Sequence, residues 1–235
     1  RSLRDLILVS IGTLSKNPLW NERIPVRTSH ATTTLLRTTV ADTDRAPRTI
    51  LVDPSLPAQI LAARLEERSG LRPDAVTHVF LTNWRPIHRR GLDAFPHATW
   101  WMHETEIDAA SEALDRATQA AENQGHTPDP LIQQERDLLA RVHPAPDDLA
   151  AGVDLYPLPG YTPGQCGLLI SEPTRTTIIA GDAVPTAAHF LAGQVFPDCY
   201  DLAKAKESLG ELYEVADLII PGHDNLFLTP RAHSV

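Results

Sequence analysis

The strongest constraint on the fold of this 235-residue chain lies in residues 76–91, which read V-T-H-V-F-L-T-N-W-R-P-I-H-R-R-G. The β-branched and apolar run from Val76 to Leu81 predicts a buried strand. Because Pro86 cannot continue a strand, the polar segment Asn83–His88 is predicted to be a tight loop. The rest of the chain is therefore interpreted around one buried strand that ends in a loop of polar side chains.

Strand-like and helix-like runs alternate in both halves of the chain. Further strands are predicted over Asp5–Thr13, Ala31–Val40, Thr49–Val52, Ala98–Met102, Val153–Leu158, Cys166–Ile170, Thr176–Ala180 and Asp217–Ile220. Helices are predicted over Pro57–Ser69, Glu104–Asn123, Leu131–Val142 and Leu202–Val215. The segment Ala41–Arg48 is expected to be a turn that joins two of the strands into a hairpin. This alternation predicts sheet inside and helices outside, and no linker divides residues 1–235 into separate domains.

Composition limits the classes of function. The chain is 42% hydrophobic and 22% charged, which is typical of a soluble globular protein. Its net charge of -9 argues against a general nucleic-acid binder. No apolar run approaches the ~20 residues that a membrane span needs, so no membrane association is expected. The two cysteines, Cys166 and Cys199, are interpreted as buried reduced thiols, from which a cytoplasmic location is expected.

Five short motifs follow one another, each at the end of a predicted strand. They are L-V-D-P at Leu51–Pro54, the loop Asn83–His88, P-G-Y-T-P-G at Pro159–Gly164, Gly181-Asp182, and Pro221-Gly222-His223. In this order they resemble the motifs of the metallo-β-lactamase fold superfamily, and the resemblance covers nearly the whole chain. It implies a four-layer αββα sandwich, with two sheets face to face. It also implies that the helical insertion at about 104–142 forms a lid or substrate wall.

Much of the family's metal motif is missing. The family ends its strand with T-H-x-H-x-D-H, whereas here Asn83 and Arg85 stand at the first two His positions and Ile87 at the Asp position. Tyr161 replaces the His of P-G-H-T-P-G. The resemblance places the first metal at the positions of Asn83, Arg85 and Tyr161, and an Arg side chain cannot ligate. The first metal site is therefore expected to be lost.

The resemblance leaves three ligands for the second metal, namely His88, Asp182 and His223. Two imidazoles and one carboxylate, with a water, can hold a single Zn²⁺, Mn²⁺ or Fe²⁺. The alternative is that the three side chains are hydrogen-bonding loop residues and that no metal binds. In the family the Asp at the position of Asp53 supports the metal loop through hydrogen bonds.

Several neighbouring side chains are candidates for substrate contacts. Arg85 is expected to pair with Asp182, and the alternative is that it points to solvent. If it pairs, the site is expected to be structural or to bind an anion through Arg85 and Arg89. Tyr161 donates a hydrogen bond to a ligand, acts as an acid, or packs in the space of the missing imidazole and metal. Trp84 either lines a pocket or packs. His189 lies in a segment from which family members draw substrate contacts.

Two functions remain open. The first is a hydrolase with one metal, which would cleave an ester, lactone or thioester through metal-bound water. Asp182 would be its central carboxylate, and Asp224, beside His223, the candidate for proton transfer. The second is a non-catalytic, metal-free binding or scaffold module, which the apolar Ile87 favours. In either case the expected partner is a small molecule, anionic if Arg85 contacts it, and the sequence predicts neither the substrate nor the oligomeric state.

Overall fold

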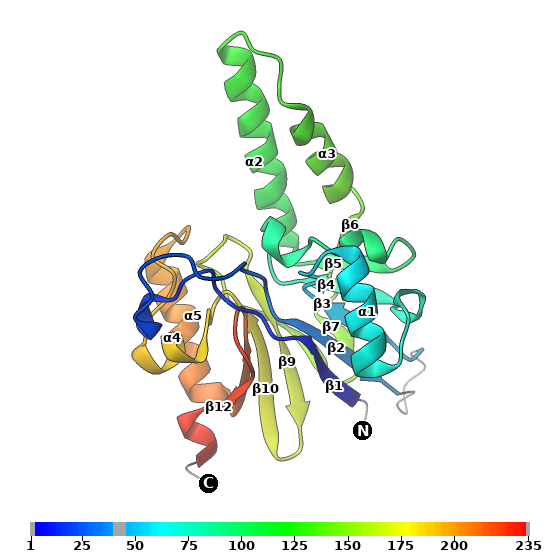
Figure 1. The fold of residues 1–235 in the computed structure, drawn as a ribbon, viewed down its shortest axis with the longest axis vertical. Helices are drawn as coiled ribbons and strands as arrows, with labels where there is room; N and C mark the ends of the chain where they lie inside the picture. Colours follow the sequence, from blue (N-terminus) through cyan, green and yellow to red (C-terminus); the bar gives the residue numbers. More distant parts are fainter. Residues whose placement is uncertain (1–2, 40–45, 234–235) are drawn as a thin grey trace.

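Two six-stranded sheets form the centre of the computed structural model, which describes residues 3–39 and 46–233 (Figure 1). The first sheet has the order β1-β2-β3-β4-β5-β6, with β1 (Leu3–Ser10), β2 (Thr33–Thr38), β3 (Thr49–Val52), β4 (His78–Leu81), β5 (Thr99–Met102) and β6 (Val142–Pro144). The second has the order β12-β11-β10-β9-β8-β7, with β7 (Asp148–Ala150), β8 (Val153–Pro157), β9 (Cys166–Glu172), β10 (Arg175–Gly181), β11 (Leu218–Pro221) and β12 (Phe227–Leu228).

Five α-helices and several short 3-10 turns complete the described part of the chain. The helices are α1 (Ala58–Ser69), α2 (Glu104–Asn123), α3 (Pro130–Leu139), α4 (Ala187–Ala192) and α5 (Leu202–Val215). The 3-10 turns are η1 (Pro18–Trp20), η2 (Pro73–Ala75), η3 (Pro86–His88), η4 (Leu92–Ala94) and η5 (Pro230–His233). None of the helices in the described ranges is both long and apolar enough to cross a membrane.

The core shows why strands such as β3, β4 and β11 have apolar residues at neighbouring positions. Successive side chains of a strand point to opposite faces of the sheet. Phe80 therefore packs into the cluster between the two sheets, whereas its neighbour Val79 packs under α1 with Leu61. In the second sheet, Ile179 faces the first sheet and Ile178 faces α5. Three core layers separate four structural layers, so the predicted αββα sandwich is confirmed.

Figure 1 shows α2 and α3 as a hairpin that stands away from the body of the sandwich. They occupy most of the predicted insertion at 104–142, but the predicted helix Leu131–Val142 is too long. Helix α3 ends at Leu139, and Val142 begins β6, where it pairs with Trp100 of β5. The apolar pattern of this segment continues across the break because Val142, the first residue of β6, is buried next to β5.

Other expectations differ from the structure in detail. The predicted strand Asp5–Thr13 is shifted, since β1 is Leu3–Ser10. The short elements β7, β12 and α4 were not predicted, because two to six residues carry little periodicity. Much of the predicted turn Ala41–Arg48 lies outside the described residues. Both cysteines are free, with Cys166 buried and Cys199 half-buried.

Candidate metal centre

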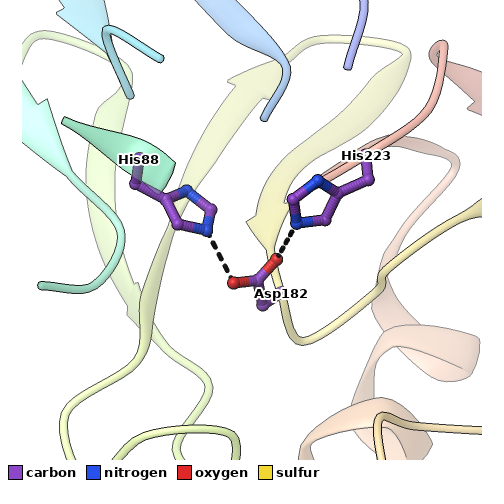
Figure 2. Close-up of side chains that lie close together, drawn as sticks. All are labelled: His88, Asp182 and His223. Carbon is purple, nitrogen blue, oxygen red and sulfur yellow. Dashed lines mark hydrogen bonds and ion pairs between the residues drawn. The ribbon is translucent and has the colours of Figure 1, made fainter. Parts of the chain in front are cut away.

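His88 lies at the end of the turn η3, which follows β4 and begins at Pro86. The imidazole is completely buried and lies between two carboxylates. Its Nδ1 is 2.9 Å from Oδ2 of Asp53, and its Nε2 is 2.6 Å from Oδ2 of Asp182 (Figure 2). Burial opposes the charged form of this ring, but the carboxylates of Asp182 and Asp53 outweigh it and raise the pKa of His88 to about 10.

Asp53 fixes the position of the His88 ring. It follows β3 in a left-handed conformation with φ of 51°. Its Oδ1 accepts a hydrogen bond from the backbone N–H of Thr82 at 2.9 Å, and its Oδ2 accepts one from the Thr82 hydroxyl at 2.7 Å. The carboxylate therefore links the end of β3 to the end of β4 and holds Nδ1 of His88, which is the supporting position that the family resemblance implied.

His223 enters the centre from the loop after β11. Its Nδ1 lies 3.0 Å from the carbonyl oxygen of His30, so this nitrogen carries the proton. Its Nε2 faces Asp182 at 2.8 Å from Oδ1 (Figure 2). The preceding Gly222 is required, because a Cβ there would lie 2.6 Å from the same carboxylate oxygen.

The carboxylate of Asp182 is the central group. Burial would raise its pKa, but the facing rings of His88 and His223 outweigh burial and hold the pKa well below its usual value. Its Oδ1 is close to Nε2 of His223 without hydrogen-bond geometry, and it has no hydrogen-bond partner among the described residues. A buried carboxylate oxygen without a donor is costly unless a cation compensates it.

The donor set fits a divalent cation. The ligand atoms of His88, Asp182 and His223 all lie within 4.8 Å of one another, and all three side chains are buried. Each ring has its Nδ1 against an oxygen acceptor, which leaves Nε2 available to a metal. Two imidazole nitrogens and one carboxylate oxygen are the ligand types that Zn²⁺ accepts.

The residues at the positions where the family has ligands for its first metal make other contacts in this structure. Asn83 is fully buried, and its Nδ2 donates to Oδ2 of Asp182 at 3.1 Å. Arg85 is exposed, and its guanidinium lies 5.1 Å from the ring centre of Tyr161. No ion pair joins Arg85 to Asp182 or to any other carboxylate in the described ranges, so the expected Arg85–Asp182 pair is wrong. The carboxylate of Asp182 instead faces the rings of His88 and His223. Burial and then the charge of Asp182 raise the pKa of Tyr161.

Arg89 and Trp84 have structural partners. The guanidinium of Arg89 pairs with Glu135 of α3 at 2.6 and 3.1 Å and lies 3.9 Å from the ring centre of Trp84. The expectation that Arg89 binds an anion is therefore wrong, since a carboxylate of the protein already occupies it. Trp84 packs partly against the core beneath α1, and it also lines the cleft described below.

Glu106 is a buried residue of the site region that the sequence analysis did not identify. One of its oxygens accepts from the backbone N–H of Trp84 and the other from that of Gly164, both at 2.9 Å. A Cβ at Gly164 would lie 2.1 Å from the backbone nitrogen of Glu106, so the 159–164 loop approaches α2 closely. An acidic residue on the buried side of the first helical turn was the only sequence signal for this role.

The remaining candidates lie around the centre. Nδ1 of His189 is 2.8 Å from the hydroxyl of Thr186, and burial lowers the pKa of His189. The carboxylate of Asp224 accepts backbone N–H groups of Ala187 and Asn225, at 3.1 and 2.8 Å. Neither residue belongs to the group of three ligands. Ile87 is half-buried and offers its carbonyl to Ser55.

A cleft of about 1010 Å³ lies next to the centre, at the base of the helical hairpin. Its walls come from the loops and from one face of α2, and they include Trp84, Arg85, Tyr161, Ala109 and Tyr200. The stacked pair of Arg85 and Tyr161 therefore faces this cleft on one side.

Solved structures with the same fold are numerous, although identities are low. AidC, a dizinc quorum-quenching lactonase in complex with a product, shares 19% identity over 84% of this chain and 75% of its own, with a TM-score of 0.62. An N-acyl homoserine lactone hydrolase with N-hexanoyl-L-homoserine at its catalytic metal centre shares 19% identity, over 95% and 93% of the two chains, with a TM-score of 0.58. A hydrolase of the beta-lactamase superfamily, AbOPH, shares 15% over 85% and 79%, with a TM-score of 0.59.

No curated protein matches the sequence. The family model described as the metallo-beta-lactamase superfamily matches residues 45–223, a range that contains every motif from L-V-D-P to His223. This match covers well over half of the chain and agrees with the four-layer fold. The chain therefore belongs to the metallo-β-lactamase superfamily.

Proposed function

We propose that the protein is a hydrolase of small-molecule lactones, esters or thioesters that works with a single divalent cation, Zn²⁺, Mn²⁺ or Fe²⁺. The ligands are His88, Asp182 and His223. The observation that carries this proposal is the arrangement of their donor atoms. Both Nε2 atoms face one buried carboxylate, of which one oxygen has no hydrogen-bond donor among the described residues.

A bound cation would act as a Lewis acid and lower the pKa of a water molecule toward ~7. The chain's own residues orient the imidazole rings of the two histidine ligands. Asp53 and the carbonyl of His30 fix the two rings, so that the lone pairs of Nε2 point inward. Asp182, the proposed central carboxylate, is held between them. In this proposal Asp224, the residue directly after His223, would take the proton that leaves the water.

The cleft beside the centre is the proposed place for the substrate. Its walls combine apolar surface with the guanidinium of Arg85, which has no carboxylate partner among the described residues. Arg85 and Tyr161 would contact an anionic or carbonyl oxygen, and Trp84 would pack against the apolar part. His189 does not line this cleft and is proposed only as a further substrate contact. Two of the similar structures are lactonases, one of them with an acyl-homoserine product at its metal centre, which supports a lactone as the first substrate to try.

The test is metal content followed by hydrolysis. Protein purified without chelator, then incubated with Zn²⁺ or Mn²⁺ and dialysed, should hold about one equivalent by elemental analysis. The His88→Ala variant should lose it, whereas His126→Ala, an exposed histidine on the α2–α3 loop, should keep it. The metal-loaded protein is then assayed on acyl lactones, aryl esters and thioesters. Absence of metal from the incubated wild type would contradict the proposal.

A metal-free binding module is the second candidate, and one observation favours it. The charged ring of His88 between Asp53 and Asp182 already forms a buried ion-pair network without any cation. If this reading is right, chelator should leave the folded protein equally stable, and an anionic ligand should still bind in the cleft. Quenching of Trp84 fluorescence by such a ligand, lost in Arg85→Met and kept in Arg64→Met, would identify this function.

A further inference from the structure

We infer that two side-chain amides, those of Asn83 and Gln165, replace the family's first metal ion and turn Asp182 into the ligand of one cation only. Gln165 is a positioning residue in this arrangement, since it acts on Asp182 through Asn83. The inference rests on the proposed one-metal centre and adds the reason why this centre binds one cation and not two.

The orientation of both amides is fixed by backbone groups, whose polarity cannot be exchanged. Gln165 Nε2 donates to the carbonyl oxygen of Ala180 at 3.1 Å, so Gln165 Oε1 faces the other way. That oxygen accepts from Asn83 Nδ2 at 2.8 Å. At the other end, Asn83 Oδ1 accepts from the backbone N–H of Arg85 at 2.9 Å. Both anchors require Asn83 to direct its NH₂ group inward.

The inward NH₂ group donates to two oxygens at once. Besides Gln165 Oε1, it reaches Oδ2 of Asp182 at 3.1 Å. Both protons of the amide are thereby used. A cation at this position would need lone pairs directed at it, whereas Asn83 presents N–H groups, so a metal cannot bind there.

The fold leaves a buried space for the side-chain amides of Asn83 and Gln165. Asn83 and Gln165 are 0% and 1% exposed. Gly181 has φ of 53°, and a Cβ at this position would lie 2.6 Å from Gln165 Nε2. The glycine before Asp182 therefore leaves the space that the Gln165 amide fills, while the amide chain leaves Oδ1 of Asp182 as the oxygen without a donor.

The decisive variant is Asn83→Asp, which keeps the size of the side chain and replaces the NH₂ group by an oxygen. The new carboxylate would face Gln165 Oε1 and Asp182 Oδ2, so three oxygens would converge where the wild type has donors. We expect this variant to bind two equivalents of Zn²⁺, against one for the wild type, by elemental analysis and calorimetric titration. Asn123→Asp, the same change at an exposed position of α2, is the matched control and should bind one.

A metal-free measurement keeps the inference testable even if the wild type binds nothing. In chelator, Asn83→Asp should melt roughly 5–10 °C below the wild type, because two carboxylates and an amide oxygen meet without a donor. The control Asn123→Asp should melt within about 2 °C of the wild type. A wild type without metal would overturn the proposed hydrolase alone. Two metals in the wild type, or an unchanged melting temperature of metal-free Asn83→Asp, would overturn the amide replacement.

Discussion

At the scale of single residues, Asp53 shows how a side chain away from the ligands controls them. Its left-handed backbone turns the carboxylate toward His88, and Thr82 donates to both of its oxygens. Asn also tolerates this backbone conformation, so Asp53→Asn keeps the shape of the turn. The substitution removes the negative charge beside His88 and introduces an NH₂ group. This group must face at least one of the three donors that now surround the carboxylate, which are the backbone N–H and the hydroxyl of Thr82 and Nδ1 of His88.

We expect Asp53→Asn to weaken Zn²⁺ binding about 10- to 100-fold, which is the usual cost of losing an outer hydrogen-bond partner of a metal-bound histidine. Competition with a fluorescent chelator measures the affinity. Asp74→Asn, at an exposed position before β4, is the matched control. An affinity of Asp53→Asn within twofold of the wild type would contradict the role given to this carboxylate.

His78 of β4 is half-buried and stacked on Trp101, with ring centres 4.1 Å apart. Burial, and then the charge of Arg48, lower the pKa of His78 to about 4 from 6.5. The unfolded chain therefore binds this proton at a higher pH than the folded protein does. The stability that His78 contributes is present above about pH 6.5 and is lost as the pH falls toward 4.

The loss on acidification should be roughly 1–3 kcal/mol of unfolding free energy, after allowance for the partial exposure of the ring. Urea unfolding of the wild type at pH 7 and pH 4.5 gives the total change in unfolding free energy between these two pH values. In His78→Gln, which cannot titrate, the difference between the two pH values should shrink by this amount. An equal pH dependence in both proteins would show that His78 takes no part in it.

At the scale of elements, the α2–α3 hairpin is tied to the centre at its base. Glu106, in the first turn of α2, joins the loop after β4 to the loop after β8 by accepting one backbone N–H from each. Arg89 joins the first of these loops to α3 through Glu135. The hairpin that stands out from the sandwich is thus connected to the loops that carry His88 and Tyr161.

In Glu106→Gln, one acceptor oxygen becomes an NH₂ group that faces a backbone N–H. We expect a loss of about 2 kcal/mol in unfolding free energy, because hydrogen bonds to a buried charged group are worth about 1.5–3 kcal/mol. Denaturant unfolding gives the value. Glu104→Gln, at an exposed position two residues earlier in the same helix, should change stability by less than about 0.5 kcal/mol. Equal stability of the two variants would argue against the link.

At the scale of the whole molecule, the candidate ligands come from both halves of the sandwich. His88 follows β4 of the first sheet, whereas Asp182 and His223 follow β10 and β11 of the second. A cation shared by these three residues would therefore connect the two sheets at one edge. Because the unfolded chain lacks this arrangement, the binding free energy adds to the stability of the whole fold.

With free Zn²⁺ at about 100 times its dissociation constant, the added stability is about 2.7 kcal/mol. For a chain of this size that corresponds to a rise in melting temperature of roughly 5–10 °C relative to protein in chelator. Calorimetry with and without Zn²⁺ measures the shift. His223→Ala should melt at the same temperature in both conditions. A wild type that melts identically with metal and with chelator would favour the metal-free module.

The amino-acid pattern was enough to predict the layers of the fold and the types of side chain at the edge of the sheets. Strands buried on both faces are apolar at every position, and helices follow a 3.6-residue period, so both patterns can be recognised locally. The order of the motifs was also enough to indicate the family. Short elements such as α4 and the boundary between α3 and β6 were not predictable, because pairing with distant strands decides them.

The partner of each polar side chain could not be predicted, because it depends on which segments the folded chain brings together. Arg85 stacks on Tyr161 and leaves Asp182 to the histidines, and Arg89 pairs with Glu135. The amide of Asn83 is oriented by Gln165, which is 82 residues away along the chain. Hydrogen bonds extend over about 3 Å and require aligned donors and acceptors, so they depend on distances that only the folded chain sets. The sequence therefore gives the inventory of donors and acceptors, and the packing of two sheets decides which of them meet.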